Sequence, residues 1–121
     1  MRLDDAEVLA LGGWNGQHAK VLVTAASTNI GMALVDTNGD GANIEFEQFW
    51  RDDAGWWTPG GSSGPEPADQ GFESRVSVPG AVLAYGRSHP NGEVTIRLAG
   101  RDVTAGATAA GWWAVVVSDR G

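Results

Sequence analysis

The sequence predicts an all-β domain, built as an antiparallel β-sandwich of about eight strands. Asn-Gly, a dipeptide that favours tight hairpin turns because both residues tolerate positive φ, occurs at 15–16, 38–39 and 91–92. Apolar and polar residues alternate in the segments 43–51 and 93–99, and no stretch has the sustained 3.6-residue period of a helix. Alternation of this kind is typical of antiparallel sheets with one face on the core.

Further strands are expected at 20–26, 31–35 and 112–118, which are rich in apolar and β-branched residues. In the segment 43–51, the alternation places Ile44, Phe46, Gln48 and Trp50 on one face and Glu45, Glu47 and Phe49 on the other. Residues 4–11 are compatible with one helical turn or with an edge strand, and the sequence does not separate the two.

We expect residues 1–121 to form a single domain. The segment 58–71 contains prolines, glycines and serines at a density that excludes helix and central strand, and it predicts a flexible surface connection within the sandwich. Gly-Trp-Trp occurs at 55–57 and again at 111–113. This weak repeat indicates either a duplication or two halves of a sandwich that solve the same packing problem.

Composition excludes several classes of function. The chain has no cysteine, so it has neither disulfides nor a thiolate metal site, and this is compatible with a cytoplasmic location. Its net charge of −7 and its scattered basic residues argue against nucleic-acid binding. The chain contains no long apolar run, so membrane insertion is not expected.

The two Trp-Trp pairs are candidates for both core and surface roles. Because adjacent strand residues point to opposite faces, only one indole of each pair faces a given core. Trp113 shares its face with valines and is expected in the core, and Trp57 is expected there by analogy. Trp112 and Trp56 then lie on the outer face, where they are either covered by another segment or form an exposed aromatic platform.

The segment 36–47, D-T-N-G-D-G-A-N-I-E-F-E, matches the twelve-residue calcium pattern D-x-[DN]-x-[DN]-G-x5-E. Asp36, Asn38 and Asp40 would supply oxygen ligands, and Glu47 would close the site. The flanking segments have the composition of strands, so the closer similarity is to shorter calcium loops outside helix–loop–helix proteins. The same residues also predict a polar hairpin turn that needs no ion.

No catalytic constellation stands out. His18 and His89 are expected in surface turns, and they are too few for a zinc site. Glu45 and Glu47 lie on one strand face about 7 Å apart, a spacing compatible with paired-carboxylate chemistry. Side-by-side acids are common on solvated strands, and this pair is the basis of the enzyme alternative.

The C-terminal third contains Gly86, Pro90-Asn91-Gly92, an alternating segment 94–98, and a closing Gly-x-Trp-x-Val-x-Val at 111–117. This pattern resembles the bacterial immunoglobulin-like domains of surface and adhesion proteins. The resemblance implies a sandwich in which Gly-x-Trp marks the final strand and the Trp packs into the sandwich.

These observations favour a non-enzymatic binding or structural module that contacts protein or glycan through an aromatic face, with Trp56 and Trp112 as its binding residues. One alternative is a calcium-binding or calcium-stabilised β domain that uses the loop 36–40. The other is a small enzyme that uses the paired carboxylates.

Overall fold

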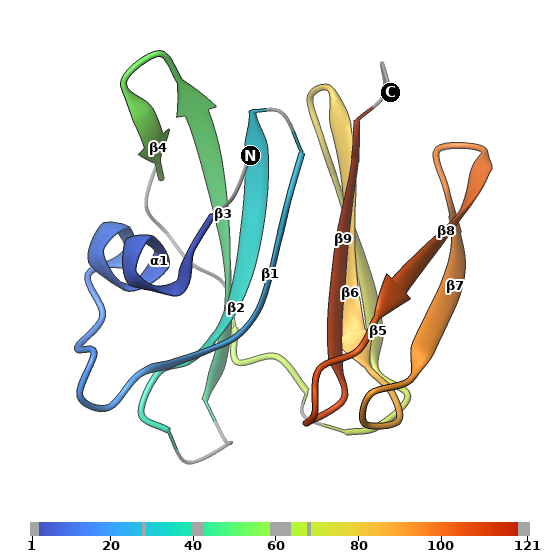
Figure 1. The fold of residues 1–121 in the computed structure, drawn as a ribbon, viewed down its shortest axis with the longest axis horizontal. Coiled ribbons are helices and arrows are strands. Elements are labelled where there is room, and N and C mark those ends of the chain that lie inside the picture. The colour runs from blue at the N-terminus through green and yellow to red at the C-terminus, as the bar shows by residue number, and fades with distance from the viewer. Residues whose placement is uncertain (1–2, 28, 40–42, 59–63, 68, 119–121) are drawn as a thin grey trace.

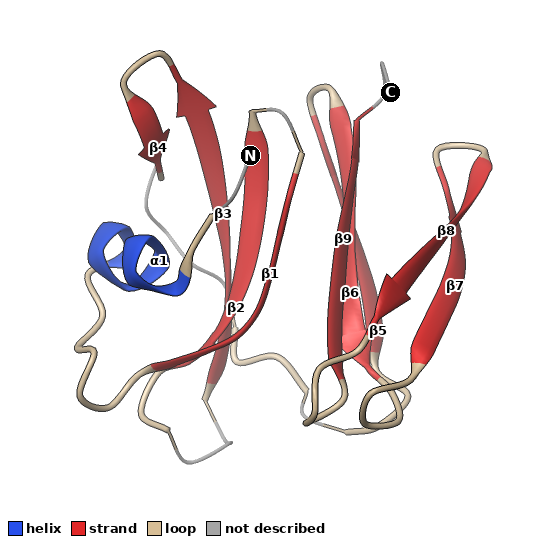
Figure 2. Ribbon diagram, viewed as in Figure 1, coloured by secondary structure: helices blue, strands red, loops and turns tan. Residues whose placement is uncertain are grey.

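The computed structural model describes residues 3–27, 29–39, 43–58, 64–67 and 69–118. These residues form one short helix, α1 (Asp5–Gly12), and nine strands, so the all-β prediction is confirmed (Figure 2). The strands are Lys20–Ala26 (β1), Ile30–Asp36 (β2), Ile44–Asp52 (β3), Gly55–Trp57 (β4), Glu73–Val78 (β5), Ala81–Arg87 (β6), Glu93–Leu98 (β7), Arg101–Gly106 (β8) and Trp112–Ser118 (β9).

The strands form three antiparallel sheets stacked in layers (Figure 1). The first sheet has the order β1-β2-β3-β4, and the second has the order β5-β6-β9. These two sheets pack face to face. Helix α1 lies on the outer face of the first sheet, and the β7-β8 hairpin lies against the outer face of the second (Figure 1).

The layers bury three apolar clusters. Between the two sheets, Met32, Leu34, Leu83 and Tyr85 belong to the central cluster, in which the Phe46 and Tyr85 rings stack with centroids 5.0 Å apart. A second cluster under α1 contains Val8, Val35 and Phe49. A third cluster, beneath the β7-β8 hairpin, contains Ile96, Leu98 and Trp113.

Strand β2 is buried along its whole length, because the inter-sheet core covers one of its faces and α1 covers the other. Its sequence, I-G-M-A-L-V-D, is a continuous apolar run that ends in an acid, as expected for a strand with two covered faces. On its neighbour β1, a bulge between Val21 and Val23 lets Leu22 and Val23 both pack on the inter-sheet side.

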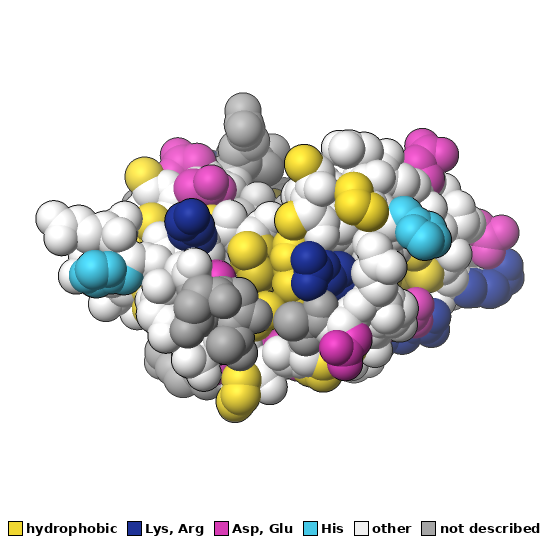
Figure 3. Space-filling model, turned by 90° about the horizontal axis from the view of Figure 1, so that it is seen from below, with side chains coloured by type: hydrophobic (Ala, Val, Ile, Leu, Met, Phe, Trp, Pro, Cys, Tyr) yellow, Lys and Arg dark blue, Asp and Glu magenta, His cyan; other side chains and the backbone are white. Residues whose placement is uncertain are grey.

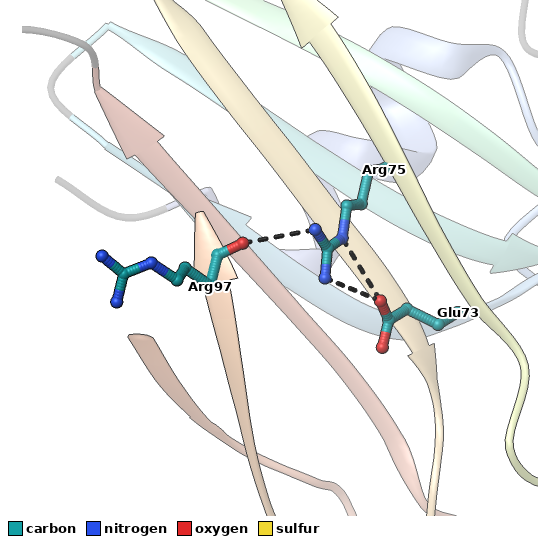
Figure 4. Close-up of polar contacts among 3 residues, drawn as sticks. All are labelled: Glu73, Arg75 and Arg97. Carbon is teal, nitrogen blue, oxygen red and sulfur yellow. Dashed lines mark hydrogen bonds and ion pairs between the residues drawn. The ribbon is translucent and has the colours of Figure 1, made fainter. Parts of the chain in front are cut away.

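Arg75 on β5 connects the second sheet to the β7-β8 hairpin (Figure 4). Its guanidinium pairs with the Glu73 carboxylate at 3.0 Å and donates to the backbone carbonyl of Arg97 on β7 at 3.3 Å. Because this pair is about half exposed, it contributes little stability by itself. Most of the attachment therefore comes from the apolar cluster beneath the hairpin.

The turns differ from the Asn-Gly prediction at two of the three sites. Gly39 has φ 76° within the β2–β3 connection, as expected of a hairpin. Asn15-Gly16 instead follows α1, and Asn91-Gly92 joins β6 to β7, two strands that do not pair. The hairpin prediction is wrong at these two sites, because both dipeptides also suit other turns. The Asn15 side chain accepts a hydrogen bond from the Gln17 amide at 2.9 Å, and Asn91 has φ 57° in a turn between unpaired strands.

The segment left open between helix and strand is the helix α1. Asp4 is its N-cap and accepts a hydrogen bond from the Glu7 amide at 2.9 Å, while Gly13 ends it with φ 74°. Within the described residues, no helix has the length and apolar character needed to cross a lipid bilayer.

The Pro/Gly/Ser segment 58–71 connects the two sheets of the sandwich. Residues 59–63 and 68 lie outside the described residues, so the predicted flexibility is not assessed there. At Glu66, the connection is attached to the first sheet, because the Glu66 amide donates to the Ile44 carbonyl at 2.7 Å.

The two Gly-Trp-Trp copies occupy different structural positions. The first copy is the three-residue edge strand β4, which pairs with β3 through a tight turn. The second begins β9, which pairs with β6 and follows the β7-β8 hairpin. The described topology therefore favours two separate packing solutions over a duplicated hairpin.

Candidate functional site

The calcium-like segment forms the connection between β2 and β3. Asp36, at the end of β2, is only 4% exposed, and its Oδ1 accepts a hydrogen bond from the Gly39 amide at 3.1 Å. Asn38 is exposed, and the expected ligand Asp40 lies outside the described residues. The described contacts of Asp36 are those of a residue that stabilises a turn.

Glu47 does not face this turn. Asp36 is the cross-strand partner of Ile44, and Glu47 is the partner of Ala33. Cross-strand partners share a face, and residues 44 and 47 differ by an odd number, so Asp36 and Glu47 lie on opposite faces of the sheet. The expected closure of the site by Glu47 is therefore wrong, because strand alternation replaces the loop–helix geometry that the pattern requires.

No cluster of three or more His, Cys, Asp or Glu side chains with the geometry of a metal site occurs in the described parts of the chain. The end of the molecule that carries the β2–β3 connection shows acidic and basic side chains interspersed (Figure 3). His18 and His89, the chain's two histidines, are exposed in the turns that follow α1 and β6, as expected.

The paired carboxylates share a face of β3, as predicted. Glu47 is only 4% exposed and accepts a hydrogen bond from the Thr58 hydroxyl at 2.8 Å. Glu45 is half-buried, and its carboxylate lies directly against Gly64. Both acids point toward the side of the sheet that α1 partly covers, and neither lines the hollows described below.

Trp112 is not a surface residue. It is 3% exposed and packs in the inter-sheet core, where the Arg87 guanidinium lies 5.0 Å from its ring centroid. Trp113 is 2% exposed and packs beneath the β7-β8 hairpin. The expected alternation holds, but both faces of β9 are covered because the hairpin adds a third β layer.

At the other pair, the expected order of exposure is reversed. Trp57 is 44% exposed, whereas Trp56 is half-buried and packs in the cluster beneath α1, near Gly31. Trp57 does lie on the inter-sheet face, since it pairs with Trp50, which packs on that core. Strand β4 is the edge strand of the first sheet, so the second sheet leaves Trp57 largely uncovered.

Trp56 and Trp112 therefore do not form one exposed platform, because they belong to different cores. The aromatic surface consists of the exposed Trp57 and its half-buried cross-strand partner Trp50. The sequence contains the signal for this pair: a two-residue turn at Asp53-Ala54 pairs residue 52 with 55 and hence residue 50 with 57.

A hollow of about 360 Å³ begins at Trp50, at the end of the sandwich where the β1–β2 and β5–β6 turns meet (Figure 1). Its walls include the apolar side chains of Ile30, Trp50 and Pro79, with polar groups supplied by Asn29 and Ser118. The volume lies at the lower end of the range for small-molecule sites.

A second hollow, of about 470 Å³, lies between β8 and β9 at the same end of the molecule. Val103, Val116 and Val117 form its apolar part, and Ser118 lines both hollows. Arg101 lies at its mouth and donates from Nη2 to the Ser118 carbonyl at 3.1 Å.

Tyr85 contributes a buried hydroxyl group elsewhere in the inter-sheet core. The hydroxyl donates to Glu66 Oε1 at 2.8 Å. Burial raises the pKa of Tyr85 to about 12, and the neighbouring Glu66 carboxylate acts in the same direction. Tyr85 lines neither hollow, so this hydroxyl group holds the connection at residue 66 against the core.

Comparison with models of protein families, with curated protein sequences and with solved structures found no match to this chain. The resemblance of the C-terminal third to bacterial immunoglobulin-like domains thus stays a resemblance of pattern. The geometry of the Trp50–Trp57 surface and the adjoining hollow is the basis for the functional inference.

Proposed function

We propose that this protein is a non-catalytic carbohydrate-binding module that holds a sugar against Trp57 and Trp50. The observation that supports the proposal is an exposed indole beside a concave, partly polar hollow. The C–H face of a pyranose ring is apolar and flat enough to stack on an indole, while its hydroxyl groups need polar partners. Asn29 and Ser118 offer such partners in the adjoining hollow.

The shape of the surface favours a small ligand over a protein partner. Stable protein interfaces bury about 800 Å² on each side around a cluster of buried apolar residues. Among the described residues, no large apolar side chain other than Trp57 is strongly exposed, so these residues form no broad apolar patch around it. One indole next to a hollow of about 360 Å³ matches one or two sugar rings better.

The test is titration of the protein, and then of a variant at the exposed indole, with a panel of neutral and acidic oligosaccharides. Trp57→Ala should weaken binding of a panel ligand at least tenfold, about 1.4 kcal/mol, because the stacking surface is removed. Trp14→Ala is the matched control, since it removes a half-buried indole on the α1 side of the molecule. It should leave the affinity unchanged once folding is verified by circular dichroism.

Binding that is equally tight in Trp57→Ala would refute the proposal, as would a panel in which no oligosaccharide binds at millimolar concentration. Parallel titrations with EDTA and with calcium address the calcium alternative. Carbohydrate binding through the Trp50–Trp57 surface should be the same in both.

A further inference from the structure

The second hollow continues the first. Trp57 pairs with Trp50, Trp50 lines the first hollow, and Ser118 at the end of β9 lines both hollows. The two hollows therefore adjoin at Ser118, and the first of them is linked to Trp57 through Trp50. Together the two hollows, of about 360 and 470 Å³, form a groove with more room than a single sugar ring on the Trp50–Trp57 surface needs.

Arg101 places a positive charge in the second hollow. Arg101 donates one guanidinium hydrogen bond to the Ser118 carbonyl, which orients the group at the junction of the hollows. Asp102 also lines the second hollow, but its carboxylate pairs with Arg97 at 3.3 Å. Among the described residues, Arg101 has no carboxylate partner, so its remaining N–H donors are available to an anion.

From this arrangement we infer that the groove binds an extended acidic oligosaccharide, with the carboxylate of a uronic acid residue at Arg101. This inference rests on the proposed carbohydrate-binding function and specifies its ligand class. A planar guanidinium matches a carboxylate in a two-point contact, and charge-assisted hydrogen bonds are the stronger kind. The apolar floor of Val103, Val116 and Val117 supports the face of the same ring.

Because the whole molecule is negatively charged, a preference for acidic ligands has to come from a local positive charge such as Arg101. At −7, the chain repels anions in general, so an acidic sugar gains nothing from long-range attraction. A preference for the acidic ligand therefore depends on Arg101 itself. That preference should persist at 150 mM salt, since contact pairs are screened less than distant charges.

The experiment compares the affinities of a neutral oligosaccharide and of its counterpart that carries a uronic acid, by isothermal titration. The wild type should bind the acidic form about five- to tenfold more tightly, in line with a partly exposed charge-assisted contact. Arg101→Gln should remove this preference, because it should weaken binding of the acidic form far more than binding of the neutral form, while Arg101→Lys should keep part of the preference. Arg51→Gln is the matched control, because Arg51 lies on β3 opposite Trp56 and lines neither hollow.

A wild type that does not prefer the acidic form, or an Arg101→Gln variant that retains the full preference, would overturn the inference. In both cases a loss of neutral-sugar binding in Trp57→Ala would still support the proposed function. If neither sugar bound to the wild type, both proposals would fail together.

Discussion

Tyr85 shows how one residue connects stability to pH. Its hydroxyl lies in the inter-sheet core, bonded to Glu66, with a pKa raised to about 12 from the usual 10. Between those pH values the unfolded chain has released the proton while the folded protein retains it. Fewer protons bound to the unfolded state means that stability falls as pH rises.

We therefore expect the free energy of unfolding to decrease between pH 10 and 12 by roughly 2–3 kcal/mol from this group, at about 1.4 kcal/mol per pKa unit. Tyr85→Phe should cost about 1 kcal/mol at pH 7, through the lost hydrogen bond. It should also flatten the alkaline decline. Urea denaturation at pH 7, 10, 11 and 12 measures both effects, and an equally steep decline in the variant would contradict the assignment to Tyr85.

The alternation of side chains between the two faces of a strand was predicted correctly, but the layers that cover those faces were not. The two faces of β9 were separated correctly between Trp112 and Trp113, yet both indoles are buried. Alternation states which residues share a face, whereas exposure depends on the layer that covers that face. Trp57 lies on the face expected of it and is exposed because an edge strand extends past the opposite sheet.

Among the elements, β6 tolerates little change at Gly86. A Cβ built there would collide with the Phe72 carbonyl and lie 2.9 Å from Trp113 Cζ2. Neither group can yield easily, because the first is backbone and the second is a packed indole. The close approach of the backbone at 72 and of Trp113 to β6 therefore depends on the missing side chain.

Gly86→Ala should lower the free energy of unfolding by about 1–3 kcal/mol or more, as overpacked sites do. Gly106→Ala on β8 is the matched control, since a Cβ there meets nothing within 4 Å. The control should be neutral or slightly stabilising, because alanine restricts the unfolded chain more than glycine does. Equal stabilities of the two variants in urea denaturation would show that β6 can move away from Trp113.

The positions of turns and helix ends were the features predicted least well from the sequence. The β7–β8 hairpin turns at Ala99-Gly100 with φ 51° and 78°, so alanine occupies a position where asparagine is preferred. Leu98 pairs with Arg101 across this two-residue turn, although the sequence there has no Asn-Gly. For α1 the signal was present, since Asp4 followed three residues later by Glu7 is a helix-start pattern.

At the scale of the whole molecule, strand composition predicted the sandwich but not its number of layers. The continuous apolar run of β2 and the apolar residues on both faces of β9 are marks of strands with two covered faces. Helix α1 covers β2 and the β7-β8 hairpin covers β9. These contacts arise from tertiary packing, which local sequence patterns do not encode. The groove could not be predicted for the same reason, because it joins β8, β9 and two distant turns.

The layering also predicts unequal stability across the molecule. The β7-β8 hairpin is a two-stranded sheet, and such hairpins are marginal without packing. In the described residues, no backbone hydrogen bond joins β7 or β8 to the second sheet, and the polar links are the side chains of Arg75 and Arg101. Opening of the hairpin layer therefore disrupts one apolar cluster, whereas opening of β2 disrupts two apolar clusters.

We expect amide hydrogen exchange on β7 and β8 to be at least tenfold faster than on β2 and β6, through a local opening with a lower free energy than global unfolding. Ile96→Ala, which removes a side chain of the hairpin cluster, should accelerate exchange on β7 and β8 while β2 changes less. Leu83→Ala in the inter-sheet core is the contrasting variant and should accelerate exchange throughout. Equal protection of all strands in the wild type would mean that the hairpin and the two sheets unfold as one unit, and that the second hollow keeps a fixed width between β8 and β9.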